Sequence, residues 1–168
     1  MRRLSILKTQ DTLEELKIFM VGDLKYGRTV HSLLQAMSEF NTTFYFISPD
    51  ELKMPPSYKL FLDKKGLEYY EGNDLTAHLK EADIVYMTRV QQERFTDPIE
   101  YERVKNAYIL HRDMLEGCKE TMKVLHPLPR VNEIHTDVDA SPHAYYFKQA
   151  RNGVFVRMAI LSSILGVK

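Results

Sequence analysis

Short runs of apolar residues alternate with amphipathic stretches along most of the chain. Apolar runs that stop at polar, glycine or proline residues predict buried strands, at residues 17–23, 43–48, 67–71, 83–88, 108–110 and 122–126. Helices are expected at residues 29–40, 57–65, 74–81, 99–106 and 143–165, and the first has apolar residues at three- and four-residue intervals. This alternation predicts an α/β fold: an open parallel sheet with helices on both faces, a three-layer α-β-α, Rossmann-like arrangement.

The composition is typical of a single globular domain. The 168 residues include 23 basic and 23 acidic side chains, so the formal net charge is zero. That balance excludes an electrostatic nucleic-acid binder, and no apolar run approaches the roughly 20 residues of a membrane span, so we expect neither nucleic-acid nor membrane partners. We find no repeat or flexible linker, and residues 1–168 are expected to form one domain.

Cysteine and histidine usage gives no indication of a metal or cofactor. Cys118 is the one cysteine, which rules out an intramolecular disulfide and fits a reducing, cytoplasmic location. The histidines show no metal-ligand spacing with a second histidine or a cysteine. No metal and no cofactor are therefore expected. Residues 133–139 form an acidic, loop-like stretch, for which a solvated surface is expected.

Three loops follow predicted strands, at residues 23–29, 88–94 and 126–130, and parallel sheets place ligands at such strand ends. The first loop, from Gly22 to Thr29, has the spacing of a phosphate-binding P-loop, except that Arg28 stands in place of the lysine. A guanidinium is not equivalent to that ammonium, so a nucleotide binder is the less favoured alternative. Arg28 opens a predicted helix, where its charge opposes the helix dipole unless an anion offsets it. A carboxylate ligand would do so; a solvated surface arginine is the alternative.

The other two loops add complementary groups. Arg89 and Gln91 are two residues apart in an extended segment, so both side chains can point the same way and clamp a second carboxylate. In residues 126–130, Pro127 and Pro129 flank Leu128 and stiffen the backbone. This last segment is either a rigid strand terminator or the site of a cis X-Pro turn.

Together the loops resemble one family. Residues 20–33, 86–94 and 126–131 are similar to the catalytic chains of the aspartate carbamoyltransferase family, and the similarity continues through residues 137–139 and the closing helix. Pro127 makes the resemblance specific to the aspartate enzymes, because the ornithine enzymes have cysteine at that position. The resemblance implies transfer of the carbamoyl group of carbamoyl phosphate to the amine of L-aspartate, giving N-carbamoyl-L-aspartate and phosphate in de novo pyrimidine biosynthesis.

The resemblance also implies roles for individual residues. It implies that Arg28 and Arg89 hold the two carboxylates of aspartate and that Gln91 assists. Carbamoyl phosphate would contact Leu128 and Pro129 across a cis bond, and the Leu128 carbonyl would orient the attacking amine. The supporting residues implied are Lys25, Tyr26 and Pro127, the first two fixing the closed state of a mobile loop near Tyr101.

Members of that family carry a further domain, which binds carbamoyl phosphate and which this sequence lacks. The resemblance implies that residues 1–16 are the end of the interdomain helix and that residues 143–168 form the C-terminal helix. No complete catalytic set is expected here, so the isolated chain would be inactive unless the carbamoyl-phosphate domain is supplied in cis or in trans. The complete enzyme would be a homotrimer, with a possible regulatory chain. A non-catalytic dicarboxylate-binding or assembly domain is the alternative.

Overall fold

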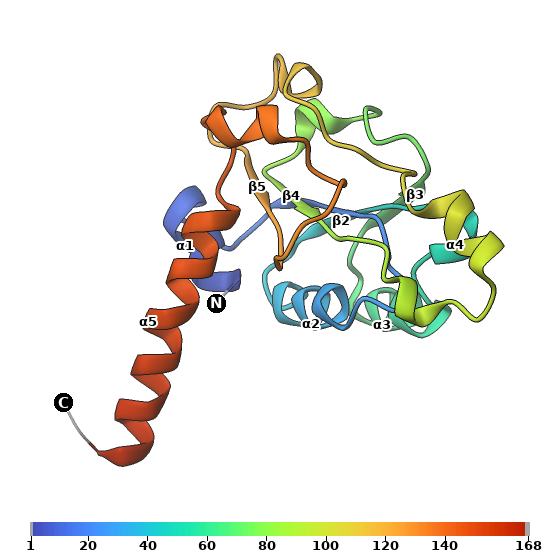
Figure 1. Cartoon of the computed structure of the whole chain (residues 1–168). Helices are drawn as coiled ribbons and strands as arrows, with labels where there is room; N and C mark the ends of the chain where they lie inside the picture. The colour runs from blue at the N-terminus through green and yellow to red at the C-terminus, as the bar shows by residue number, and fades with distance from the viewer. Residues whose placement is uncertain (1, 167–168) are drawn as a thin grey trace.

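Five parallel strands form one sheet in the order β3-β2-β1-β4-β5 (Figure 1). The computed structural model describes residues 2–166, without the side chain of Arg94; Met1, Val167 and Lys168, which belong to the expected terminal helices, lie outside the described residues. The strands are β1 (Lys17–Val21), β2 (Thr43–Ile47), β3 (Tyr69–Gly72), β4 (Ile84–Met87) and β5 (Lys123–Leu125). The parallel α/β architecture is therefore confirmed.

Each face of the sheet has its own apolar core. Three helices pack on one face: α1 (Arg2–Gln10), α2 (Arg28–Met37) and α3 (Pro56–Lys65). The opposite face is covered by loops and by the 3-10 turns η2 (Leu79–Glu81), η4 (Asp113–Leu115) and η5 (Thr136–Ala140), together with the start of α5 (Tyr146–Leu165). Alternate side chains of a strand point to opposite faces, so Ile18 and Met20 enter the first core and Phe19 and Val21 the second.

Two expected elements are absent from the described structure. Residues 74–81 do not form an α-helix: Asp74 Oδ1 accepts hydrogen bonds from the N–H groups of Thr76 and Ala77, but His78 then has a left-handed backbone with φ 62°, which a right-handed helix cannot contain. Only the 3-10 turn η2 follows. Residues 108–110 do not join the sheet either. Leu110 instead forms an isolated parallel bridge with Ile134.

The remaining elements connect the strand ends. The loop after β2 contains η1 (Asp50–Leu52), and the loop after β4 contains η3 (Gln92–Arg94) and then α4 (Pro98–Val104). Asp97 caps α4, its carboxylate accepting the Ile99 N–H at 2.8 Å. These segments leave the same edge of the sheet, where the three candidate loops also lie.

Helix α5 lies beside α1 at its start and then extends away from the rest of the chain (Figure 1). The buried residues of α5 all belong to its first eight positions, where Asn152 donates a hydrogen bond to Ser5 Oγ at 3.1 Å. Beyond them, large apolar side chains are exposed: Val154, Phe155, Met158, Ile160, Leu161, Ile164 and Leu165. The outer part of this helix therefore presents an apolar face to solvent. Among the described residues, no helix combines the length and apolar character that crossing a membrane requires.

Candidate functional site

The three candidate loops meet in one cavity of about 240 Å³, which we call the strand-end pocket. Strand order explains the meeting, because β1, β4 and β5 are neighbours in the sheet and all end at the same edge. The pocket is lined by Asp23, Gly27, Arg28, Thr29, Thr88, Arg89, Gln91, His126, Pro127, Leu128 and Pro129. Every residue to which a direct substrate contact was assigned from sequence lies in this set.

The crossing of Gly22 and Thr88 fixes the first loop against the second. Gly22 has φ +107°, and a Cβ atom there would lie 2.4 Å from the Thr88 carbonyl oxygen. Thr88 Oγ1 donates to the Val21 carbonyl at 2.9 Å and accepts from the Asp23 N–H at 3.0 Å. Only glycine combines this backbone with this close approach, so the Gly-Asp pair after β1 serves the packing of the two loops.

N–H groups of the first loop already have hydrogen-bond acceptors within the chain. The Tyr26 N–H donates to Asp23 Oδ1 at 2.8 Å, and the Leu24 N–H donates to the Leu52 carbonyl at 3.1 Å. A P-loop works by aiming several such N–H groups at phosphates. Because these donors already have partners, the geometry disfavours the nucleotide-binding alternative.

Arg28 is the first residue of α2, as its place in the sequence predicts. The helix follows Gly27, which offers no side-chain cap, and Arg28 is exposed. Within residues 2–166, no carboxylate forms an ion pair with the Arg28 guanidinium. A cation on a free helix N-terminus leaves positive charge and unused N–H donors at one place, which together attract an anion.

Arg89 has an internal partner that the sequence did not indicate. Its Nη2 lies 3.3 Å from Glu93 Oε1, an i,i+4 contact across the start of η3. About a third of the Arg89 side chain is exposed, against two thirds of Glu93. Exposed ion pairs of this length contribute little, about 0 to 1 kcal/mol. A carboxylate ligand can therefore share the Arg89 guanidinium with Glu93 or replace Glu93 there. Gln91 is half-buried and lines the same pocket as the two other loops.

His126 organises the third loop. Its N–H donates to Gln149 Oε1 of α5 at 3.1 Å, and its Nδ1 accepts from the Leu128 N–H at 2.8 Å. The Leu128–Pro129 peptide bond is cis, as the family resemblance implies, and Leu128 has a left-handed backbone with φ 50°. A left-handed backbone in a non-glycine residue is found preferentially at binding sites.

The side of His126 facing away from the pocket contacts a buried carboxylate. His126 Nε2 and Glu133 Oε1 lie 2.7 Å apart, and both side chains are almost fully buried. Because Nδ1 accepts a hydrogen bond, the ring proton belongs on Nε2, toward Glu133. Burial acts to raise the pKa of Glu133, but the contact with His126 and hydrogen bonds from backbone N–H groups outweigh it, so the pKa lies below its ordinary value.

Glu133 therefore corrects the expectation that residues 133–139 form a solvated acidic surface. Its Oε2 accepts the N–H groups of Val131 and Asn132, each at 3.1 Å. Asp139 is also paired: both of its oxygens contact the Arg130 guanidinium. No spacing rule links positions 126 and 133, so the sequence carries no local indication of this pair.

The supporting residues lie at different distances from the pocket. Pro127 lines it, but Lys25 and Tyr26 do not. The Tyr26 ring contacts Phe95 edge-on at 6.3 Å between centroids, and Phe95 contacts Tyr101 at 5.7 Å. Lys25 Nζ lies 5.0 Å above the Tyr26 ring. The first loop thus touches the segment around Tyr101 through Phe95, an intermediate that the sequence did not reveal.

One further cluster lies outside the pocket. His111, His135 and Asp137 offer ligand atoms that all lie within 4.8 Å of one another, although 24 positions separate the histidines. The sequence analysis expected no metal because it judged spacing along the chain. Tertiary structure brings these histidines together.

Sequence comparison places the chain among known proteins. Residues 14–164 match the family model described as aspartate/ornithine carbamoyltransferase, Asp/Orn binding domain. The aspartate carbamoyltransferase catalytic subunit of Bacteroides fragilis is 61% identical over 164 residues, which are 97% of this chain and 53% of that subunit. The corresponding subunit of Vibrio vulnificus is 55% identical over 162 residues, 96% of this chain and 52% of its own length. The chain spans about half the length of these relatives.

Solved structures agree with the sequence match. The catalytic subunit of M. jannaschii aspartate transcarbamoylase has a TM-score of 0.89 and 46% identity, covering 96% of this chain and 54% of that one. The aspartate transcarbamoylase from Trypanosoma cruzi, solved with carbamoyl phosphate and aspartate, has a TM-score of 0.88 and 37% identity, covering 95% and 53%. The family model, the relatives and the fold all coincide over nearly the whole chain. The chain therefore belongs to the aspartate/ornithine carbamoyltransferase family, as its Asp/Orn-binding domain.

Proposed function

We propose that the whole protein is an aspartate carbamoyltransferase and that this chain binds L-aspartate in the strand-end pocket. One observation carries the proposal: Arg28, Arg89 and Gln91 line the same small cavity as Leu128 and Pro129. The relatives named aspartate carbamoyltransferase, and the Trypanosoma cruzi enzyme solved with both substrates, support it. The reaction would transfer a carbamoyl group to the aspartate amine and release phosphate.

Aspartate recognition would use the two arginines. Each guanidinium can donate two parallel hydrogen bonds to a carboxylate, and aspartate has two carboxylates. Arg28 adds the positive end of α2, whereas Arg89 would exchange its long contact with Glu93 for the ligand. Gln91 would donate or accept beside Arg89. The neutral overall charge of the chain thus conceals a locally cationic pocket.

The third loop would hold the reacting groups. The Leu128 carbonyl would accept a hydrogen bond from the aspartate amine. This bond would direct the lone pair of the amine nitrogen at the carbamoyl carbon of carbamoyl phosphate. The uncharged amine would attack that carbon, the bond from carbon to the phosphate oxygen would break, and inorganic phosphate would leave with the proton that the nitrogen gives up. Pro127 and Pro129 stiffen this loop, so the carbonyl keeps its direction.

The remaining requirements of the reaction point outside this chain. The proposal includes a carbamoyl-phosphate domain, joined in cis or supplied in trans, that binds the phosphate and stabilises the developing charge. Of the expected residues 1–16, α1 would be the end of the helix joining the two domains, because residues 11–16 are not helical, and α5 would pack on the other domain through its exposed apolar face. A homotrimer, a possible regulatory chain and a cytoplasmic location complete the proposal, the last supported by the free thiol of Cys118.

Calorimetry with succinate, an analogue of aspartate without the amine, tests binding by this chain. Succinate is expected to bind. Arg28→Ala and Arg89→Ala are each expected to lower the affinity for succinate at least about tenfold, since each removes one guanidinium that can bind a carboxylate. Arg151→Ala, at an exposed arginine of α5, is the matched control and should leave affinity unchanged. Equal affinity in all three variants would show that the pocket does not bind dicarboxylates.

An activity assay tests the need for a second domain. The isolated chain is expected to show no carbamoyl transfer, and the addition of a family carbamoyl-phosphate domain, in cis or in trans, is expected to restore it. Turnover by the isolated chain would refute the division of roles. Succinate binding without turnover, even after that addition, would instead identify a non-catalytic dicarboxylate-binding domain.

A further inference from the structure

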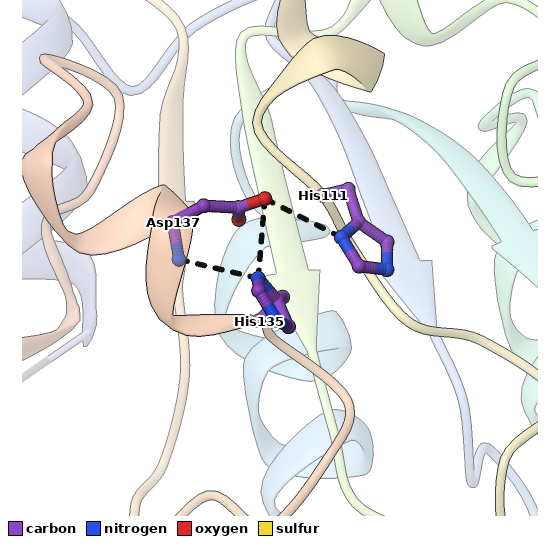
Figure 2. Close-up of side chains that lie close together, drawn as sticks. All are labelled: His111, His135 and Asp137. Carbon is purple, nitrogen blue, oxygen red and sulfur yellow. Dashed lines mark hydrogen bonds and ion pairs between the residues drawn. The ribbon is translucent and has the colours of Figure 1, made fainter.

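His111, His135 and Asp137 are held together by a short piece of parallel pairing on the second face of the sheet. The Leu110 N–H donates to the Glu133 carbonyl at 3.0 Å, and the His135 N–H donates to the Leu110 carbonyl at 2.9 Å. These two bonds place His111 and His135 side by side, with ring centroids 4.6 Å apart. Asp137 follows in η5 and points back at both rings (Figure 2).

The distances in this cluster suit a small divalent cation. Oδ2 of Asp137 lies 3.4 Å from His111 Nδ1 and 3.1 Å from His135 Nδ1. Tetrahedral bonds of about 2.0 to 2.2 Å separate neighbouring ligand atoms by about 3.3 to 3.6 Å. The distance between the ligand atoms of the two histidines, at most 4.8 Å, is longer than this. It would shorten by rotation of the two imidazole rings, which are about half exposed.

His135 Nδ1 lies against two groups of Asp137. It is 3.3 Å from the backbone nitrogen of Asp137 and 3.1 Å from Oδ2 of its carboxylate. A ring nitrogen and a carboxylate oxygen this close repel unless a proton or a cation lies between them. Asp137 Oδ1 accepts the Arg112 N–H at 3.3 Å, which keeps Oδ2 turned toward the rings.

We propose that His111, His135 and Asp137 bind one divalent transition-metal ion of the zinc class. Two imidazoles and one carboxylate favour Zn²⁺, Co²⁺ or Ni²⁺ over Mg²⁺ or Ca²⁺, which prefer oxygen ligands. The half-exposed side chains leave further coordination positions to water or a partner group. The ion would hold residues 110–111 and residues 133–137 together. The second of these segments includes Glu133, whose carboxylate contacts His126 of the strand-end pocket.

Metal titration of the untagged, chelator-treated chain tests the proposal. Calorimetry with Zn²⁺ is expected to give one site per chain, and Co²⁺ is expected to give the visible absorption of a low-symmetry, imidazole-ligated ion. His111→Ala, His135→Ala and Asp137→Asn should each weaken binding at least about tenfold, since even the loss of outer-shell partners costs about 10- to 100-fold. His78→Ala is the matched control, because His78 is also exposed and lies 2.9 Å from the carboxylate of Glu81. It should change affinity by less than about twofold.

The outcomes separate this site from the pocket and from a loss of folding. Each variant should retain the far-ultraviolet circular dichroism of the parent and its affinity for succinate, which uses other residues. Zn²⁺ affinity that is unchanged in His111→Ala and His135→Ala would overturn the site. The same conclusion follows if the parent binds no Zn²⁺, or if His78→Ala weakens binding as much as the cluster variants do.

Discussion

At the scale of single residues, His126 links three parts of the molecule. Its backbone bonds to Gln149 of α5, its Nδ1 holds Leu128 in the pocket, and its Nε2 faces the buried Glu133. Both ring nitrogens are therefore committed, and the ring cannot turn without losing a contact. A histidine for which the sequence indicates no role of its own thus sets the geometry of a candidate binding loop.

Glu133→Ala is expected to lower the free energy of unfolding by about 1 to 3 kcal/mol. The change removes the carboxylate that faces the buried His126 Nε2 at 2.7 Å and takes away the acceptor of the Val131 and Asn132 N–H groups. Chemical denaturation measures the effect, and Glu120→Ala, at an exposed carboxylate, should stay within about 0.5 kcal/mol of the parent. A cost no larger than that of the control would show that the buried contact does not stabilise the loop.

Tyr108 gives an alkaline pH dependence whose sign is fixed by burial. Burial, with Asp50 and Asp74 nearby, raises the pKa of Tyr108 to about 12, and its hydroxyl donates to the Asn73 carbonyl at 3.0 Å. The unfolded chain ionises this group near the ordinary value of 10, so between these pH values the unfolded state binds fewer protons. Folding stability should therefore fall as pH rises from about 10 to 12. Denaturation across that range should show a shallower fall in Tyr108→Phe; identical slopes would contradict the assignment.

At the scale of elements, the five strands of the sheet were predictable, whereas residues 74–81 and 108–110 and the contacts between loops were not. The strands β1, β2 and β4 are apolar along nearly their whole length because both faces of the sheet are covered, so their sequences identify them. Residues 74–81 misled because apolar periodicity does not reveal the left-handed backbone of His78, which stops a helix after the turn at Asp74. Close approaches between loops, such as that of Gly22 and Thr88, depend on strand neighbours far apart in the sequence.

Substitution at Gly22 measures that close approach. Gly22→Ala should cost about 2 to 5 kcal/mol, from about 1 to 2 kcal/mol of left-handed strain plus the overlap with the Thr88 carbonyl. Gly66→Ala is the matched control: Gly66 has φ +68°, but a Cβ atom there meets nothing within 4 Å. It should show the strain alone. If thermal or chemical unfolding shows the same loss of stability for both substitutions, the overlap with the Thr88 carbonyl is ruled out as the cause.

At the scale of the whole molecule, α5 is unusual because all of its buried residues lie within its first eight positions. Its remaining length presents apolar side chains to solvent, and seven of these residues are at least half exposed: Val154, Phe155, Met158, Ile160, Leu161, Ile164 and Leu165. Monomeric proteins rarely expose apolar patches larger than a few hundred Å². The pattern is that of a face that packs on another domain or chain.

The isolated chain is therefore expected to self-associate through α5. Sedimentation should show oligomers that dissociate on dilution, and the double change Leu161→Glu with Ile164→Glu should yield a monomer. Ser162→Glu with Ser163→Glu, on the same exposed length of helix, adds the same charge without removing apolar area, so it should weaken association less. A monomeric parent chain at high concentration would show that the exposed face does not drive association.

The order of apolar and polar residues was enough to predict the parallel α/β fold, most element boundaries to within a few residues, and the three loops that form the strand-end pocket. These follow from local physics: apolar periodicity, glycine and proline at turns, and the rule that parallel strands end at one edge. Only the tertiary structure decided the His126–Glu133 contact, the Arg89–Glu93 pair, and the meeting of His111 with His135. Such contacts depend on which strands and loops become neighbours and on how nearby side chains pack, and no spacing rule along the chain encodes that.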